Sequence, residues 1–265
     1  MTNTNRPVKL IAVASVTFAV LAGAACGGSA PAFAPAAESA PAVAAPTATA
    51  DGPGVLTGIV TFDGTAPKPR PLPMDSDPQC KATEPGGTVS EVLLVGAGNG
   101  IQNIFVYVKD GLGDRRYAAP STPVTLDQKG CRYVPHVFGI QVGQTLLVSN
   151  SDPLIHNVHA LPANNREFNF GQPAKTPPVE RVFQQPEIGL FFKCDVHGWM
   201  AAYANVVTHP FFAVTKEDGS FEIKGLPEGR YTLELWHARL GTQTVSVTVT
   251  AAVPATVAAS FKIPN

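Results

Sequence analysis

The chain has 265 residues, enough for one or two domains that each bury a core of their own. Its formal net charge is -1 and only 15% of its residues are charged, so no basic excess argues for nucleic-acid binding and no acidic tail is present. The 24 glycines and 25 prolines are many for a helical protein and favour a chain of short strands joined by turns.

The N-terminus has the features of an export signal. Arg6 and Lys9 precede an apolar run that extends to Ala25. This run is short for a membrane span but long enough for the core of a signal peptide. We therefore predict a signal peptide over residues 1–25 and a periplasmic or cell-surface location for the protein.

Cys26 follows a run of small residues, which resembles the cleavage site of a bacterial lipoprotein. Gly23 departs from that pattern, which usually has an aliphatic residue at this position. Acylation of Cys26, which would be the only attachment to a membrane, and ordinary cleavage near Ala24 therefore both stay open. Residues 26–54 are rich in Ala, Pro, Thr and Ser, so they are predicted to form a disordered tether.

The rest of the chain alternates short apolar runs with turn signals, and no segment shows a helical period. We expect strands over residues 55–62, 91–95, 102–108, 137–142, 144–149, 155–160, 181–183, 189–194, 202–207, 211–215, 220–224, 230–237, 242–250 and 256–262. Gly143 separates two of these strands in a hairpin-like or bent pair. The predicted fold class is all-β, of sandwich type.

Two segments of the chain resemble one known β-sandwich. The string TKEDGSFEIKGLPEGRYTLELW resembles the carboxypeptidase-regulatory-like, transthyretin-like module, and GVLTGIVTFDGTAP resembles the first strand of that module. The resemblance implies a split sandwich over residues 55–115 and 210–265, with a second β-domain inserted at 120–209. Two sandwiches that follow each other in series remain the alternative.

The string CDVHGWM, from Cys194 to Met200, places a thiolate, an imidazole and a thioether in one loop after a predicted strand. Soft sulfur ligands and imidazole suit copper, and a His₂Cys set with a long axial Met is the blue-copper arrangement. A second imidazole has to come from elsewhere in the fold. His156 is available after the predicted strand that leads to Asn150.

These strings resemble the cupredoxins over residues 130–208. Asn150 followed by His156-Asn157-Val158 resembles plastocyanin, and the Cys-x2-His-x2-Met spacing resembles the ligand loop of amicyanin. The resemblance implies a cupredoxin-like Greek-key sandwich that holds one type 1 copper. It assigns the metal ligands as His156, Cys194, His197 and Met200, and it implies that Asn150 or Asn157 joins the ligand-bearing segments by hydrogen bonds.

The four cysteines agree with this assignment. If Cys26 is acylated, three cysteines remain, and one disulfide plus one functional thiolate accounts for an odd number. We expect a disulfide between Cys80 and Cys131, because disulfides persist in exported proteins, and we expect Cys194 to be left for metal. A different pairing without a metal role is the alternative.

Other interpretations of the site stay open. Zinc is the main alternative metal, but it prefers nitrogen and thiolate ligands, and Met200 argues against it. Met200 could instead fill the core. His159 lies three residues after His156, so the two point to opposite faces of a regular strand. A bulge there would make His159 an alternative metal ligand, and His136 is expected to be structural.

The cupredoxin resemblance implies one-electron transfer to a redox protein, such as a periplasmic dehydrogenase or oxidase. Leu154, Gly198 and Trp199 would form an apolar collar beside His197, where such a partner docks transiently. Copper storage, delivery or sensing, and a carbohydrate or protein interaction module, are the alternatives. We do not expect an enzyme, since Gly-x-Ser-x-Gly, a phosphate loop and a dinucleotide fingerprint are absent from the sequence.

Overall fold

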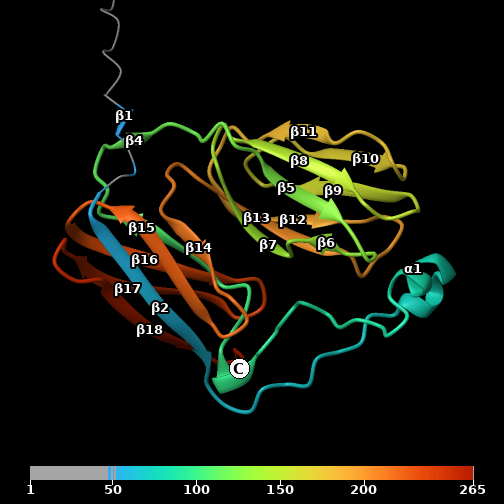
Figure 1. Ribbon diagram of the computed structural model, residues 1–265, viewed down its shortest axis with the longest axis horizontal. Helices are drawn as coiled ribbons and strands as arrows, with labels where there is room; N and C mark the ends of the chain where they lie inside the picture. The colour runs from blue at the N-terminus through green and yellow to red at the C-terminus, as the bar shows by residue number, and fades with distance from the viewer. Residues whose placement is uncertain (1–46, 49, 51, 265) are drawn as a thin grey trace, which may run out of the picture. The chain divides into compact units, whose positions relative to one another are not determined.

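The computed structural model describes residues 47–48, 50 and 52–264 (Figure 1). The predicted signal peptide, the predicted acylation of Cys26 and nearly all of the predicted tether lie outside the described residues. Within the described part of the chain, no helix is long and apolar enough to span a membrane. The described residues form an all-β structure of several sheets, as the sequence predicts.

The first sandwich consists of two sheets from the middle of the chain (Figure 1). One sheet has five strands in the order β10 (Phe168–Gln172), β9 (His156–Leu161), β12 (Glu187–Lys193), β13 (Ala201–Val207) and β7 (Val137–Gln141). The other has four strands in the order β11 (Val179–Val182), β8 (Thr145–Asn150), β5 (Val124–Gln128) and β6 (Tyr133–Val134). Apolar side chains from both sheets share one buried core, including Leu126, Val148, Val158, Phe192 and Ala204.

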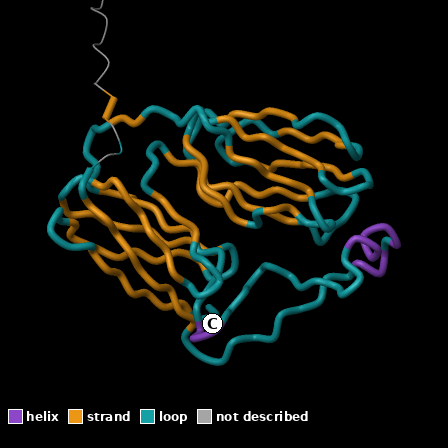
Figure 2. The backbone as a smooth tube through the Cα atoms, in the orientation of Figure 1, coloured by secondary structure: helices purple, strands orange, loops and turns teal. Residues whose placement is uncertain are grey.

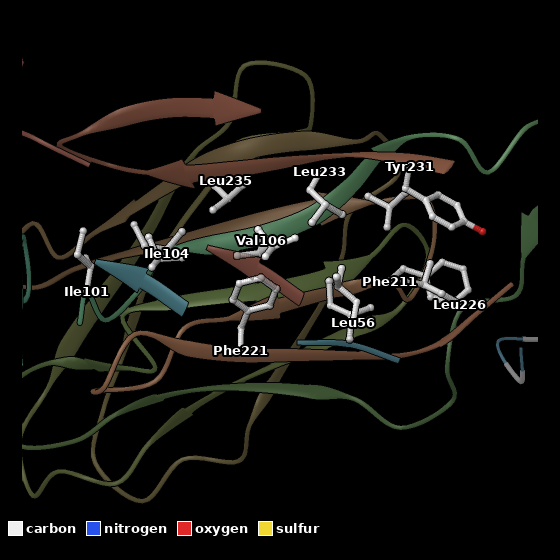
Figure 3. Packing of buried hydrophobic residues seen from close by; sticks show 14 of the residues in the cluster. Leu56, Ile101, Ile104, Val106, Phe211, Phe221, Leu226, Tyr231, Leu233 and Leu235 are labelled. Carbon is white, nitrogen blue, oxygen red and sulfur yellow. The ribbon is translucent and has the colours of Figure 1, made fainter. Parts of the chain in front are cut away.

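The second sandwich takes its strands from both sides of the first in the sequence. One sheet has the order β14 (Phe212–Val214), β3 (Phe105–Asp110), β16 (Gly229–His237) and β17 (Gly241–Val249). The other has the order β15 (Ser220–Leu226), β2 (Gly54–Phe62) and β18 (Ala255–Phe261). Figure 3 shows its core, where Leu56 and Phe221 face Val106 and Leu233. A short parallel pair, β1 (Thr47–Ala48) and β4 (Arg116–Tyr117), lies outside these sheets.

A long connecting segment lies between β2 and β3, and we call its residues 63–100 the strap (Figure 2). It contains two 3-10 turns, η1 (Met74–Ser76) and η2 (Ala97–Asn99), and the helix α1 (Pro78–Thr83). Its two arms hold each other by backbone hydrogen bonds between Leu72 and Thr88 and between Ser90 and Arg70. The strap is therefore a folded segment, although it belongs to neither sandwich.

The expectation of a strand over residues 91–95 is wrong. Only Val95 forms a bridge there, with Ile101, because β2 and β3 already have a partner strand on each side. One short helix is present in the described residues, although no segment after the predicted signal shows a helical period. The helix α1 has six residues, too few for a helical period, and the side chain of Asp77 caps it by accepting from the amides of Gln79 and Cys80.

The sequence analysis also missed β5 and β10, together with the two-residue strands β4 and β6, and left the geometry at Gly143 open. The strands β5 and β10 each place a glutamine inside the sandwich, Gln128 and Gln172, and the two side-chain amides bond to each other at 2.7 Å. A buried glutamine interrupts the apolar alternation that identifies a strand in the sequence. At Gly143 the chain bends from β7 in one sheet to β8 in the other, so the two strands are not a hairpin.

Candidate metal centre

The first candidate ligand, His156, begins β9 and points into the first sandwich. Side chains alternate across a strand, so His156 is buried with Val158 and Ala160, while Asn157 and His159 face the other way. The turn before β9 is held by Asn150, whose side-chain amide donates to the carbonyls of Leu154 and Gln172 at 2.9 and 2.8 Å. These two hydrogen bonds fix the turn and thereby the position of the His156 imidazole in the core.

The other three candidate ligands lie in the loop between β12 and β13. The pairing of Lys193 with Ala201 closes this loop, and the amide of Met200 donates to the carbonyl of His197 at 2.9 Å. Antiparallel pairing of Phe192 with Ala160 brings β12 beside β9 and thereby brings the loop to His156. Cys194, His197 and Met200 are each at most 2% exposed.

Three ligand atoms converge at the end of the sandwich. The Nδ1 atoms of His156 and His197 lie 3.0 Å apart, and the Sγ of Cys194 lies 3.8 Å from Nδ1 of His197. One ligand atom from each of the three residues lies within 4.8 Å of those of the other two. Met200 is buried in the same core cluster as Cys194, so the thioether side chain lies in the same apolar surroundings.

A carboxylate lies beside Nε2 of each imidazole, the ring nitrogen that faces away from the other histidine. Nε2 of His156 lies 2.8 Å from Asp152 and Nε2 of His197 lies 3.1 Å from Asp77. A carboxylate only accepts hydrogen bonds, so each Nε2 carries a proton, and in the neutral form of each ring the Nδ1 atom has a lone pair that faces the other ring. Two lone pairs at 3.0 Å repel each other unless a proton or a metal cation lies between them.

The surroundings of Cys194 favour its thiolate. Burial raises the pKa of this thiol, but hydrogen bonds from His156 and from the amides of Asn157, His197 and Val196 oppose that effect and lower the pKa to about 7. The amide of Asn157 reaches Sγ at 3.4 Å and that of His197 at 3.3 Å. Burial also lowers the pKa of His156, whereas hydrogen bonds to Asp152 and Cys194 raise it above its usual value.

These donors fit copper. Two imidazole nitrogens and a thiolate, with a buried thioether in the same loop, are the ligand types of blue-copper sites. Both rings present Nδ1 because their Nε2 atoms are engaged, and a carboxylate on the outer nitrogen is the usual way in which proteins orient a metal-binding histidine. His156, Cys194, His197 and Met200 would therefore hold the ion.

Asn157 joins the two ligand-bearing segments, as the cupredoxin resemblance implies for one of the two asparagines. Its backbone amide donates to Sγ of Cys194, and its side-chain oxygen accepts from the amide of Asp195 at 3.0 Å. Asn150 makes no hydrogen bond to the loop that carries Cys194, because its side chain bonds to Asp152, Leu154 and Gln172. Asn157 thus joins the two ligand-bearing segments, whereas Asn150 holds the turn before His156.

The remaining histidines of the described chain lie apart from this group. His159 bonds to Asp195 at 3.0 Å and to Glu167 at 2.8 Å on the outer face of β9, which forms no bulge at this point. Nδ1 of His136 lies 2.8 Å from the carbonyl oxygen of Ala201. His159 is thus not placed to replace His156.

A disulfide lies beside the candidate ligands. It joins Cys80 to Cys131, the pair expected from the sequence, and Cys194 is the only free cysteine in the described part of the chain. The ligand-type atoms of Cys80 and His197 lie within 4.8 Å of each other, as do those of Cys131 and His156. The disulfide therefore links the strap to the segment between β5 and β6, close to both histidines.

The expected apolar docking collar beside His197 is covered only in part, because Gly198 is exposed and Trp199 is half-buried. Leu154 is 7% exposed and packs with Met74, Cys80 and Cys131, while Trp199 donates from Nε1 to the carbonyl of Cys131 at 3.0 Å. The strap supplies the covering side chains. Nothing in the local sequence of the ligand loop indicates such a cover, because the strap is far away along the chain.

Two residues of the site, Asp77 and Asp152, were missed in the sequence analysis. Asp152 stands in a Ser-Asp-Pro turn and Asp77 precedes a proline, so each resembles an ordinary turn residue. The Asp-Pro pair is also a start signal for a helix, which would have located α1 but not the contact of Asp77 with His197.

Comparison of sequences finds one family. Residues 197–262 match the β-sandwich domain of ER membrane protein complex subunit 7. The match covers much less than half of the chain and comprises β13 together with five strands of the second sandwich. The carboxypeptidase-regulatory-like relationship stays a prediction. No curated protein matches the chain.

Comparison of structures finds copper proteins at low similarity. A copper-containing nitrite reductase from Thermus scotoductus is 20% identical with a TM-score of 0.30, and the alignment covers 37% of this chain and 25% of that one. A purple cupredoxin from Nitrosopumilus maritimus is 23% identical with a TM-score of 0.27, over 31% of this chain and 98% of that one. A mutant amicyanin in its Cu(I) form is 16% identical with a TM-score of 0.28, over 38% and 97%. TM-scores this low establish neither a shared fold nor a shared function.

Proposed function

We propose that the protein binds one copper ion in a type 1 site formed by His156, Cys194, His197 and Met200, and that it acts as a one-electron carrier. The convergence of the two Nδ1 atoms and Sγ supports this proposal, since each Nε2 is held by a carboxylate and the inner atoms are left to a cation. Copper when bound supplies the one-electron chemistry.

The residues around the site suit electron transfer because they restrict movement and exclude water. His156, Cys194 and His197 are at most 2% exposed. Two backbone amides aim at Sγ, and hydrogen bonds to the cysteine sulfur are one of the means by which proteins tune the potential of such a site. A site that is held by backbone pairing on both sides reorganises little when the ion changes charge.

We further propose that the protein is exported to the periplasm or the cell surface and exchanges electrons with a redox protein such as a dehydrogenase or oxidase. The Cys80–Cys131 disulfide supports export, because disulfides persist in oxidising compartments. The location also agrees with the signal peptide predicted over residues 1–25.

The test is to add one equivalent of Cu(II) to the full chain and record visible and EPR spectra. We expect intense blue or purple absorption and the small copper hyperfine splitting of a thiolate-bound ion. Cys194→Ser should lose both signals while keeping its far-ultraviolet circular dichroism. Cys26→Ser removes a different cysteine and should keep the colour. A wild-type protein with a pale spectrum and ordinary splitting would overturn the proposal.

Copper storage or delivery is a second candidate, and the cover over His197 favours it. A closed site holds its ion tightly, whereas an electron carrier needs a short path from the ion to its partner. Reversible electrochemistry without loss of copper would support the carrier. Copper transfer to a chelator in only one of the two oxidation states would support delivery.

An interaction role for the second sandwich is a third candidate, favoured by the match of residues 197–262 to a domain from a subunit of a membrane protein complex. In this case the second sandwich would bind a protein or carbohydrate. Mutations of its exposed residues would abolish that binding and leave the copper spectra unchanged.

A further inference from the structure

The strap supplies a residue that touches the candidate metal centre. Oδ2 of Asp77 lies 3.1 Å from Nε2 of His197, although the two residues are separated by 120 positions in the chain. The side chain of His197 is 3% exposed and that of Asp77 is 28% exposed. Asp77 therefore lies at the boundary between this ring and solvent.

The two oxygens of Asp77 have separate partners. Oδ1 accepts from the amides of Gln79 and Cys80 at 2.8 and 3.3 Å and so caps α1. Oδ2 remains for the imidazole of His197. Because the cap orients the carboxylate, the position of Oδ2 is determined by the fold of the strap.

The strap is attached to the first sandwich around this contact. Cys80, three residues after Asp77, forms the disulfide with Cys131. Met74 and Cys80 are buried against Leu154, with Trp199 packed beside them. These attachments lie on both sides of the Asp77 carboxylate, so it cannot leave His197 unless they open.

The other imidazole has an equivalent partner from within the first sandwich. Asp152 binds Nε2 of His156, and its oxygens accept from the amides of Gly130 and Cys131 at 2.7 and 2.8 Å. Each ring therefore has one carboxylate that is oriented by backbone amides. The strap supplies the carboxylate that binds His197, and the first sandwich supplies the carboxylate that binds His156.

We propose that Asp77 is a positioning residue of the metal centre, which keeps the proton of His197 on Nε2 and closes the outer edge of the ring. This inference rests on the proposed function, because the purpose of that tautomer is to leave Nδ1 free for copper. Residues that orient a metal-binding histidine in this way typically contribute about 10- to 100-fold to metal affinity.

Asp77→Asn is the sharpest test. Asparagine caps helices about as well as aspartate, so α1 should stay folded. With the amide oxygen at Gln79 and Cys80, the NH₂ group faces Nε2 of His197. Two donors cannot pair, so the ring is driven to carry its proton on Nδ1, the atom that copper needs. We expect copper affinity to fall by about 10- to 100-fold, measured by competition with a chelator.

Two further variants separate positioning from general stability. Asp75→Asn is the matched control, since Asp75 lies on the same strap in an exposed ion pair with Lys81 at 2.9 Å and does not touch the site. It should leave the affinity unchanged. Asp77→Glu keeps a carboxylate and should recover part of the affinity that Asp77→Asn loses.

A measurement on the copper-free protein distinguishes a failure of this inference from a failure of the proposed function. Nitrogen-15 NMR of the imidazoles should show a proton on Nε2 of His197 in the wild type and its loss in Asp77→Asn. An unprotonated Nε2 in the wild type would overturn the inference without any variant. So would an Asp77→Asn protein that keeps both the Nε2 proton and wild-type affinity. A wild type that binds no copper but shows the expected tautomers would overturn the proposed function and leave only the control of the His197 tautomer by Asp77.

Discussion

Asp152 binds Nε2 of His156 at 2.8 Å and is itself held by the amides of Gly130 and Cys131. Burial raises the pKa of Asp152, but the hydrogen bonds from His156 and these amides outweigh burial and lower it below its usual value. The carboxylate therefore stays charged inside the protein. It connects a candidate metal ligand directly to one end of the disulfide.

Replacing this carboxylate by an amide should damage both the metal site and the fold. In Asp152→Asn the NH₂ group must face either a backbone amide or Nε2 of His156, and a buried donor without an acceptor costs about 1–3 kcal/mol of unfolding free energy. Copper affinity should fall by about 10- to 100-fold. Denaturant unfolding of the copper-free protein and chelator competition measure the two effects.

Asp127→Asn is the control for this prediction. Asp127 bonds to the side chain of Ser151 at 2.7 Å in the adjacent turn and is not in contact with the histidines. Equal effects of the two substitutions on copper affinity would contradict a specific role for Asp152.

The copper-free protein should show a titration of Cys194. Its thiol has a pKa of about 7 in the folded chain, against 9.0 for an unperturbed thiol. A lowered pKa stabilises the folded state above the unfolded pKa, and this stability is lost as the pH falls through the folded pKa. The wild type should therefore lose stability relative to Cys194→Ser as the pH falls from 9 to below 7. Ultraviolet absorbance of the thiolate locates the midpoint, and a midpoint near 9 would contradict the hydrogen-bonding described for Sγ.

Removing the disulfide should loosen the strap. Its cysteines are separated by 51 positions, and the chain-entropy relation gives a stabilisation of about 4 kcal/mol for a loop of that length. The double substitution Cys80→Ala and Cys131→Ala should therefore lower the unfolding free energy of the copper-free protein by about 2–4 kcal/mol. Thermal and denaturant unfolding measure it, and an unchanged value would show that the other strap contacts suffice.

A glycine marks where the two sandwiches meet. Gly189 in β12 has a φ of +75° and an added Cβ would lie 2.7 Å from the ring of Trp236 in β16. Gly189→Ala should cost about 1–2 kcal/mol for the left-handed backbone alone, and more for the contact with the ring. Gly241→Ala is a matched control, because Gly241 has a φ of +82° with open space around it. Equal losses in unfolding free energy for the two variants would contradict close packing at Trp236.

The ligand loop could be identified from the sequence because its information is local. Cys194, His197 and Met200 stand at fixed spacing within one loop, and the strands on either side alternate apolar and polar residues or form apolar runs. The all-β class followed from the same patterns and from the many turn residues. Strands that bury glutamines, such as β5 and β10, lack this signal and were missed.

The surroundings of the ligands depend on contacts between distant parts of the chain. No pattern near Asp77 indicates that its carboxylate reaches an imidazole 120 positions away, since that contact requires the path of the strap, the cap of α1 and the disulfide together. For the same reason the sequence predicts an open apolar collar beside His197, whereas the folded chain buries Leu154 of that collar beneath the strap. The sequence by itself determined which side chains offer ligand atoms, because ligand chemistry is a property of the residue. The tertiary structure alone decided which nitrogen of each ring faces the site and how much of the site meets solvent, because both depend on long-range packing.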